Sequence, residues 1–112
     1  LFIFVQVKKE LEMNPAPGSW SGSENVRLEI ANPTAFDSES SFKAVLSIPI
    51  MEGVVVKDGS AIIDSLKAGK SDTVKLKYTI NKNAKGKEIP LTITVFYGSG
   101  VSFKETVIVK VK

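Results

Sequence analysis

The chain of 112 residues contains no histidine and no cysteine, and these two absences remove several classes of function at once. Serine and cysteine nucleophile systems need a histidine base, and zinc sites draw most of their ligands from histidine and cysteine. Without cysteine there is no disulfide framework, and a domain of this length does not need one. We therefore expect no enzymatic activity, no catalytic residues, no cofactor and no metal.

Arginine is nearly absent as well. Arg27 is the only one, so the net charge of +3 comes almost wholly from lysine. A protein that binds nucleic acid would more often use arginine forks and aromatic residues clustered on one face, so we expect no nucleic acid partner. The longest unbroken apolar stretch, Leu1 to Val5, is far short of the roughly 20 residues that a membrane span requires. No membrane span is expected within this chain.

Acidic and aromatic residues in the predicted loops offer little chemistry. Asp37 and Glu39 share a loop and could act as a carboxylate pair or donate oxygen ligands to calcium, but no Asp-x-Asp-x-Asp-Gly loop occurs. Solvated loop acids are the simpler interpretation. Trp20 and Phe36 are the plausible loop aromatics. Trp20 is interpreted either as a cover over the open end of the core or as an exposed ligand platform.

Alternation of apolar and polar residues organises the rest of the chain. The predicted strands cover residues 2–11, 26–30, 42–48, 54–56, 73–80, 91–97 and 101–111. Turn signals stand between them at Asp58-Gly59, at Ala68-Gly69-Lys70 and at Gly98-Ser99-Gly100, and the stretch from Ala61 to Leu66 is expected to be irregular. Gly69 is predicted to adopt a positive φ.

Seven short strands at near-regular spacing predict an all-β fold. We expect a single domain over residues 1–112, an immunoglobulin-like β-sandwich of about seven antiparallel strands with no disulfide. The shared parity of apolar positions predicts a core that includes Leu28, Ile30, Leu46, Val74, Leu76, Ile93, Val95 and Val109.

Four segments carry a resemblance to a known family. They are Asn25 to Pro33, the run from Pro49 to Val56, the entry Leu66-x-Ala68-Gly69-x-Ser71-x-Thr73-Val74, and the strand Leu91 to Tyr97. Together they resemble the cell-adhesion-related repeats called CARDB and the related accessory modules of archaeal S-layer-type proteins and secreted glycosidases. The resemblance implies an extracellular or cell-surface location and a role as a spacer or an adhesive unit.

The chain begins with Leu1 rather than with methionine. We therefore expect it to be excised from a larger secreted or membrane-anchored protein, in which a removed upstream segment could serve as the anchor. The opening from Leu1 to Val5 is interpreted as the start of the first strand, or alternatively as the end of such an anchor.

Four lysines project outward from two predicted strands, Lys75 and Lys77 from residues 73–80, and Lys104 and Lys110 from residues 101–111. They can serve solubility and the blocking of edge pairing, or they can form a cationic face that docks on acidic polysaccharide. Glu29 is expected to lie across from Lys75 and Lys77, because the second and fifth strands pair in such sandwiches.

Two apolar residues, Phe96 and Ile108, have outward parity on neighbouring strands. If they lie close together they form one apolar patch, either covered within the domain or available as a docking point for a partner with Phe96 as its anchor. With Trp20 and the four lysines, they complete the candidate partner-binding residues.

These observations predict a non-enzymatic structural or adhesive module of a cell-surface or extracellular protein that acts by protein–protein contacts. Its expected partners are neighbouring domains or subunits at the cell surface, acidic polysaccharide or an S-layer. Two alternatives remain open. One is the soluble domain of a membrane-anchored archaeal filament or motility (archaellum-type) subunit, and the other is a carbohydrate-binding accessory domain of a secreted hydrolase.

Overall fold

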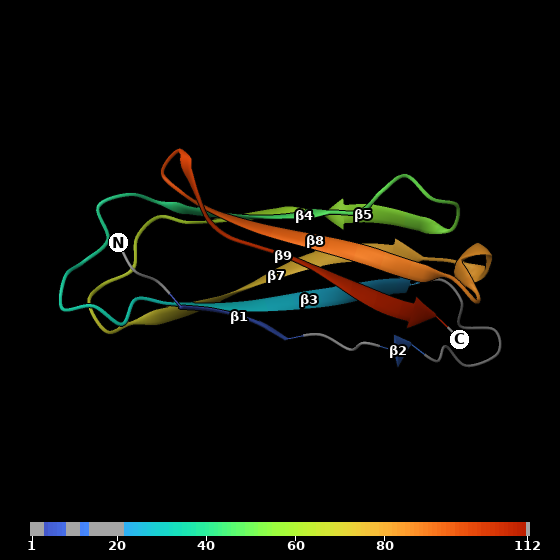
Figure 1. Cartoon of the computed structure of the whole chain (residues 1–112), viewed down its shortest axis with the longest axis horizontal. Coiled ribbons are helices and arrows are strands. Elements are labelled where there is room, and N and C mark those ends of the chain that lie inside the picture. The colour runs from blue at the N-terminus through green and yellow to red at the C-terminus, as the bar shows by residue number, and fades with distance from the viewer. Residues whose placement is uncertain (1–3, 9–11, 14–21, 112) are drawn as a thin grey trace.

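The computed structural model describes residues 4–8, 12–13 and 22–111, with side chains from residue 26 onward, and it places them in two stacked β-sheets (Figure 1). The first sheet has the order β1-β3-β7-β5 and the second has the order β2-β9-β8-β4-β6. The strands are β1 (Phe4–Lys8), β2 (Glu12–Met13), β3 (Gly22–Ala31), β4 (Phe42–Ser47), β5 (Val54–Asp58), β6 (Ser60–Ile63), β7 (Ser71–Ile80), β8 (Glu88–Tyr97) and β9 (Gly100–Val111).

The strand order is that of an immunoglobulin sandwich. Strands β1, β3, β7 and β5 take the positions of A, B, E and D, and β9, β8 and β4 take those of G, F and C. All pairings among the seven strands from β3 to β9 are antiparallel. Strand β1 joins β3 antiparallel, and β2 joins the end of β9 in parallel. The predicted fold class is therefore confirmed.

The core lies between the sheets and follows the alternation of the sequence. Seven of the eight predicted core residues are buried, and the exception is Val74, which is half-buried near the start of β7. Side chains of one parity face the other sheet because successive residues of a strand point to opposite faces. The fully buried large side chains include Leu28, Ile30, Phe42, Leu76, Ile89, Leu91, Ile93, Val95 and Val109.

Two sequence-based expectations about residues 58–66 are wrong. Asp58-Gly59 is not a turn, because Gly59 is the single residue between β5 and β6. Part of the stretch expected to be irregular belongs to β6, which pairs with β4 in the second sheet, whereas β5 pairs with β7 in the first. The chain therefore passes from one sheet to the other at Gly59, whose carbonyl oxygen accepts a hydrogen bond of 2.7 Å from the Leu46 N–H. A Cβ at Gly59 would lie 2.6 Å from Cγ1 of Val56, so any other residue here would force the Val56 side chain to shift.

The strands run along the longest dimension of a molecule that measures 49 × 22 × 18 Å (Figure 1). Loops 32–41 and 64–70 and the hairpin at 98–99 gather at one end, which is on the left in the figure. Loops 48–53 and 81–87 lie at the other end, the latter with the 3₁₀ helix η1 (Lys82–Ala84). Among the described residues, no helix has the length and apolar character needed to cross a membrane.

Gly69 precedes β7 with φ of +71°, which confirms the predicted left-handed conformation. A Cβ added there would meet nothing within 4 Å, so any penalty for a side chain arises from the backbone alone. We expect Gly69→Val to lower the free energy of unfolding by about 1–3 kcal/mol, measured by chemical denaturation.

The matched control is Gly100→Val, because Gly100 begins β9 without a positive φ and the nearest atom to its added Cβ lies at 3.8 Å. This control should be neutral or slightly stabilising. Equal losses in the two variants would contradict the backbone argument.

Candidate functional site

The four candidate lysines lie on two different faces of the sandwich. Lys75 and Lys77 are on β7 in the first sheet, whereas Lys104 and Lys110 are on β9 in the second sheet. The structure therefore does not bring them together into one cationic surface. Trp20, the aromatic candidate, lies outside the described residues.

The pairing of the second and fifth predicted strands is confirmed as β3 with β7, but Glu29 does not lie directly opposite a lysine. It faces Thr73, and Lys75 faces Arg27. Two cations directly opposite each other on neighbouring strands repel, so this pair does not stabilise the sheet. Strand pairing follows from fold class, but register also depends on where each strand begins and on turn geometry.

Phe96 and Ile108 do not form one patch. Phe96 pairs with Val101 beside the hairpin, whereas Ile108 pairs with Pro90 near the other end of the same two strands. Six residue steps along β8 separate the two pairs, which corresponds to about 20 Å along a strand. Phe96 is half-buried and Ile108 is 44% exposed. A tight hairpin makes the two strands neighbours, but it brings together only residues equally far from the turn.

Phe96 instead belongs to a different set of apolar residues on the outer face of the second sheet. The register aligns Ile62 with Lys43, Lys43 with Phe96, and Phe96 with Val101, across β6, β4, β8 and β9. Ile62 is 66% exposed and Val101 is 60% exposed. We call Ile62, Lys43, Phe96 and Val101, which are three apolar residues with one lysine between them, the outer-face row. Apolar residues gathered on a solvated sheet face are typical of a contact surface.

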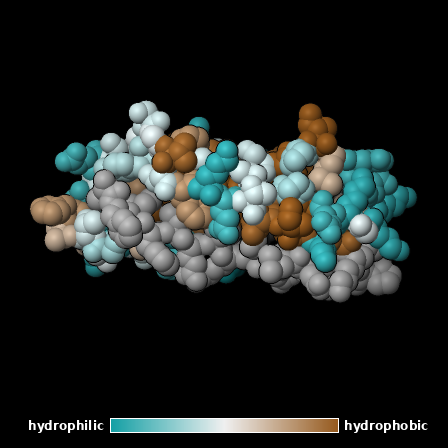
Figure 2. Space-filling view, in the orientation of Figure 1, coloured by the Kyte–Doolittle hydropathy of each residue, from teal (hydrophilic) through white to brown (hydrophobic). Residues whose placement is uncertain are grey.

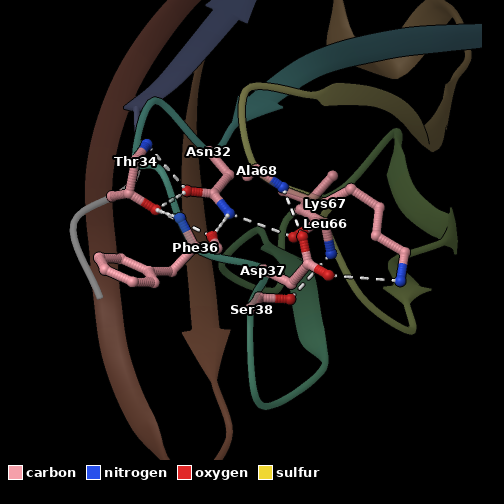
Figure 3. Close-up of polar contacts among 8 residues, drawn as sticks. All are labelled: Asn32, Thr34, Phe36, Asp37, Ser38, Leu66, Lys67 and Ala68. Atoms are coloured by element: carbon pink, nitrogen blue, oxygen red, sulfur yellow. Dashed lines mark hydrogen bonds and ion pairs between the residues drawn. The ribbon is translucent and has the colours of Figure 1, made fainter.

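The loops at the hairpin end are held together by the side chain of Asn32, the first residue after β3 (Figure 3). Only 1% of Asn32 is exposed, and its amide has a full set of partners. Its Nδ2 donates to the carbonyl oxygens of Phe36 and Leu66 at 2.8 and 3.1 Å, and its Oδ1 accepts from the N–H and hydroxyl of Thr34 at 3.1 and 2.6 Å. The amide thereby joins loop 32–41 to loop 64–70.

A second set of bonds connects the same two loops. The Ser38 N–H donates to the Leu66 carbonyl at 2.9 Å, and the Leu66 N–H donates to the Ser38 hydroxyl at 2.8 Å. Oδ1 of Asp37 accepts from the Ala68 N–H at 2.8 Å, and its Oδ2 lies 3.5 Å from the ammonium of Lys67. The bond from Ala68 is the main cause that holds the pKa of Asp37 below its ordinary value. Burial of the carboxylate acts in the opposite direction and raises the pKa, whereas the charge and hydrogen bond of Lys67 lower it further.

This network displays the ring of Phe36 to solvent. The backbone of Phe36 is bonded on both sides, since its carbonyl accepts from Asn32 and its N–H donates to the Thr34 hydroxyl at 3.3 Å, while the single proton of that hydroxyl goes to Oδ1 of Asn32, the shorter of its two contacts. The side chain nevertheless remains 75% exposed. Exposed aromatic rings on a fixed backbone lose little conformational freedom on binding, which favours contact with a ligand or partner.

Phe36, Asp37, Glu39 and Tyr97 line an open hollow of about 290 Å³ at this end of the molecule. Tyr97 fixes its wall, because its hydroxyl accepts from the N–H groups of Glu39 and Ser40 at 2.8 and 3.2 Å. Its ring packs 4.9 Å from the buried ring of Phe42. We call this site the end hollow.

The end hollow combines two aromatic rings with two exposed carboxylates, and such a combination suits a cationic group. Asp37 already has partners, whereas the carboxylate of Glu39 makes no hydrogen bond or ion pair to any described residue. No group of three or more acidic side chains in the described part of the chain is arranged to hold a metal ion.

From the sequence, Asp37 and Glu39 were identified as two acids that share one loop, and Phe36 only as a loop aromatic; the three were not brought together with one another. Tyr97 was missed as part of the site, because from the sequence it is only the last residue of the predicted strand 91–97. The role of Asn32 was missed as well, because this residue lies just beyond the predicted strand 26–30 and carried no prediction of its own. A polar residue at a strand end followed by two short polar loops is a signal for such a joint, but the partner loop begins more than 30 residues later.

The Asn32 amide provides a direct test of the loop network. Asn32→Asp keeps the shape but removes both N–H donors, which leaves the carbonyls of Phe36 and Leu66 without this partner and places a carboxylate beside them. We expect the free energy of unfolding to fall by at least about 2–3 kcal/mol, measured by urea denaturation at neutral pH.

The control for this variant is Asn83→Asp, the same chemical change at an exposed position of η1. It should alter stability by no more than about 0.5 kcal/mol. Similar effects at the two positions would show that the Asn32 bonds contribute little.

The lowered pKa of Asp37 predicts how stability depends on pH. Its folded pKa lies below the ordinary aspartate value of 3.8, so its contribution to stability is present above that value and is lost as the pH falls through the folded pKa. Asp37→Asn should therefore lower the melting temperature at pH 6, and the difference from the unchanged chain should shrink as the pH falls below 3.8 and the carboxylate becomes protonated. Glu39→Gln removes a charge from the same loop without touching Ala68, and its difference should stay small over the same pH range. A difference for Asp37→Asn that is independent of pH would contradict this assignment.

Comparison with known proteins adds no family to these observations: no family model matches the chain, and a search of curated proteins finds no match. The fold is that of an all-β domain of two sheets.

Proposed function

We propose that this chain is a non-enzymatic structural or adhesive module of an extracellular or cell-surface protein, and that it acts by protein–protein contacts. The observation that carries the proposal is the outer-face row, in which Ile62, Phe96 and Val101 lie in register on a solvated sheet face. The resemblance of the sequence to CARDB repeats and S-layer-type modules supports the location.

The energetics of the row suit a contact surface. Ile62 and Val101 contribute little to the core while more than half of each remains exposed, so their apolar area gains most when a partner covers it. Lys43 lies between Ile62 and Phe96, and its aliphatic stem can be covered while its ammonium remains in water. Neighbouring domains or subunits at the cell surface are the partners that we propose for this face.

A second candidate, the soluble domain of a filament or motility subunit, is favoured by a different observation. The two ends of the elongated molecule carry different chemistry, with the end hollow at one and the lysine-bearing loop 81–87 at the other. Repeated contact between unlike ends is the arrangement that builds open chains.

The outer-face row can be tested with isolated cell envelopes of the source organism. We expect the purified chain to co-sediment with the envelopes, and the double variant Ile62→Thr/Val101→Thr to bind at least tenfold more weakly, because the change removes apolar area at both ends of the row and a tenfold loss corresponds to only about 1.4 kcal/mol in total. The melting temperature should change little, since both side chains are mostly exposed.

The matched control is Val55→Thr/Ile108→Thr, which changes two exposed apolar residues outside the row. This control should bind envelopes as the unchanged chain does. The proposal fails if the unchanged chain does not co-sediment, or if the row variant and the control bind equally well.

A further inference from the structure

The two ends of the molecule differ in charge. Loop 81–87 contains Lys82, Lys85 and Lys87 and no acidic residue, and Figure 2 shows a hydrophilic surface at this end. Glu52 and Glu88 lie nearby, but Lys110, which is opposite Glu88 on β9, adds a fourth cation. At the hairpin end, the end hollow presents the carboxylates of Asp37 and Glu39, and the neighbouring loop 64–70 carries Asp64, Lys70 and Lys67, the last paired with Asp37.

Each end presents exposed charged groups that have no partner among the described residues, and Lys82 and Glu39 are two of them. Lys87 donates from its ammonium to the Glu52 carbonyl at 3.0 Å, and Lys85 also has an interaction. Lys82 is exposed and makes no hydrogen bond or ion pair through its side chain to any described residue. It is the counterpart of Glu39, the carboxylate in the end hollow that also lacks one.

These two groups cannot meet within one molecule. Strand β8 begins directly after loop 81–87 and ends at Tyr97, in the wall of the end hollow. Its nine residue steps correspond to about 30 Å, so a rigid sheet holds the two sites apart. Only a second molecule can bring a lysine loop to the end hollow.

We propose that copies of this chain associate head to tail, with loop 81–87 of one copy seated on the end hollow of the next. The ammonium of Lys82 pairs with the carboxylate of Glu39 beside the exposed ring of Phe36. A cation gains from the face of an aromatic ring as well as from a carboxylate. This inference rests on the proposed function of the chain as a module that acts by protein–protein contacts.

The backbone around the end hollow is already ordered before such a contact forms. Phe36 is fixed through its backbone by Asn32 and Thr34, and the Glu39 N–H donates to the Tyr97 hydroxyl, so little ordering remains to be done on binding. The lysine loop is fixed as well, because the Gly86 N–H donates to the Val111 carbonyl at 2.8 Å. The contact joins unlike surfaces, so each copy leaves one free hollow and one free loop, and the assembly grows into an open chain unless it closes.

Charge reversal tests the contact by sedimentation velocity at low salt. The unchanged chain should show a sedimentation coefficient that rises with concentration, and the rise should weaken as salt screens the exposed charges. Glu39→Lys and Lys82→Glu should each weaken self-association at least tenfold. The double variant Glu39→Lys/Lys82→Glu should recover it, because the reversed charges again attract.

The control variants Glu105→Lys and Lys104→Glu change the same charges on exposed positions of β9, between the two ends, and they should associate as the unchanged chain does. An equimolar mixture of Glu39→Lys and Lys82→Glu should associate into alternating chains, because Lys82 of the first variant faces Glu39 of the second and the two reversed charges face each other at the next contact. Melting temperatures of all variants should match, since every changed side chain is exposed.

Three outcomes would overturn the inference. In the first, the unchanged chain stays monomeric up to about 1 mM, within the range of weak contacts. In the second, the single variants associate as the controls do. In the third, the double variant does not recover self-association. A monomeric chain whose Phe36 resonances shift on addition of oligosaccharide would instead assign the end hollow to a sugar. Envelope binding through the outer-face row is measured separately. If Glu39→Lys loses self-association but still binds envelopes, the two contacts are independent, and the failure of one proposal can be told from the failure of the other.

Discussion

The buried amide of Asn32 is the interaction on which the rest of the hairpin end depends. Two sheets packed through apolar side chains specify how their faces meet, but not how the loops beyond them are arranged. Asn32 supplies that specification because each of its donors and acceptors has a partner in loop 32–41 or loop 64–70. An incompletely bonded amide at the same position would cost stability. The exposed ring of Phe36 and the wall of the end hollow are consequences of this arrangement.

The sequence was sufficient to predict the fold class and most of the core, because alternation is a local property that burial enforces along each strand. Val26, Leu28 and Ile30 could be assigned to the interior of β3 without knowledge of any other strand. Register could not be predicted in this way. The separation of Phe96 from Ile108, and the position of Glu29 opposite Thr73, depend on which residues two strands share, and alternation is unchanged when one strand shifts by two.

The end hollow was beyond prediction for a related reason. Its residues come from loop 32–41 and from the last residue of β8, and they meet only because hydrogen bonds join loops that are distant in sequence. Loop composition indicated acidic and aromatic residues but not their assembly. The outer-face row and the end hollow lie on different surfaces, so a module of this kind can hold one partner on its sheet face and another at its end.

The passage of the chain between sheets at Gly59 has a consequence for how the sandwich opens. In a sandwich joined only by side-chain packing, the sheets can separate without breaking any backbone hydrogen bond. Here β5 and β6 are covalently continuous but hydrogen-bonded to different sheets, and the Gly59 carbonyl is itself bonded to Leu46. Separation at this edge must therefore break part of a ladder, and backbone amides of β4 and β7 beside it should exchange with solvent through a shared opening event rather than independently.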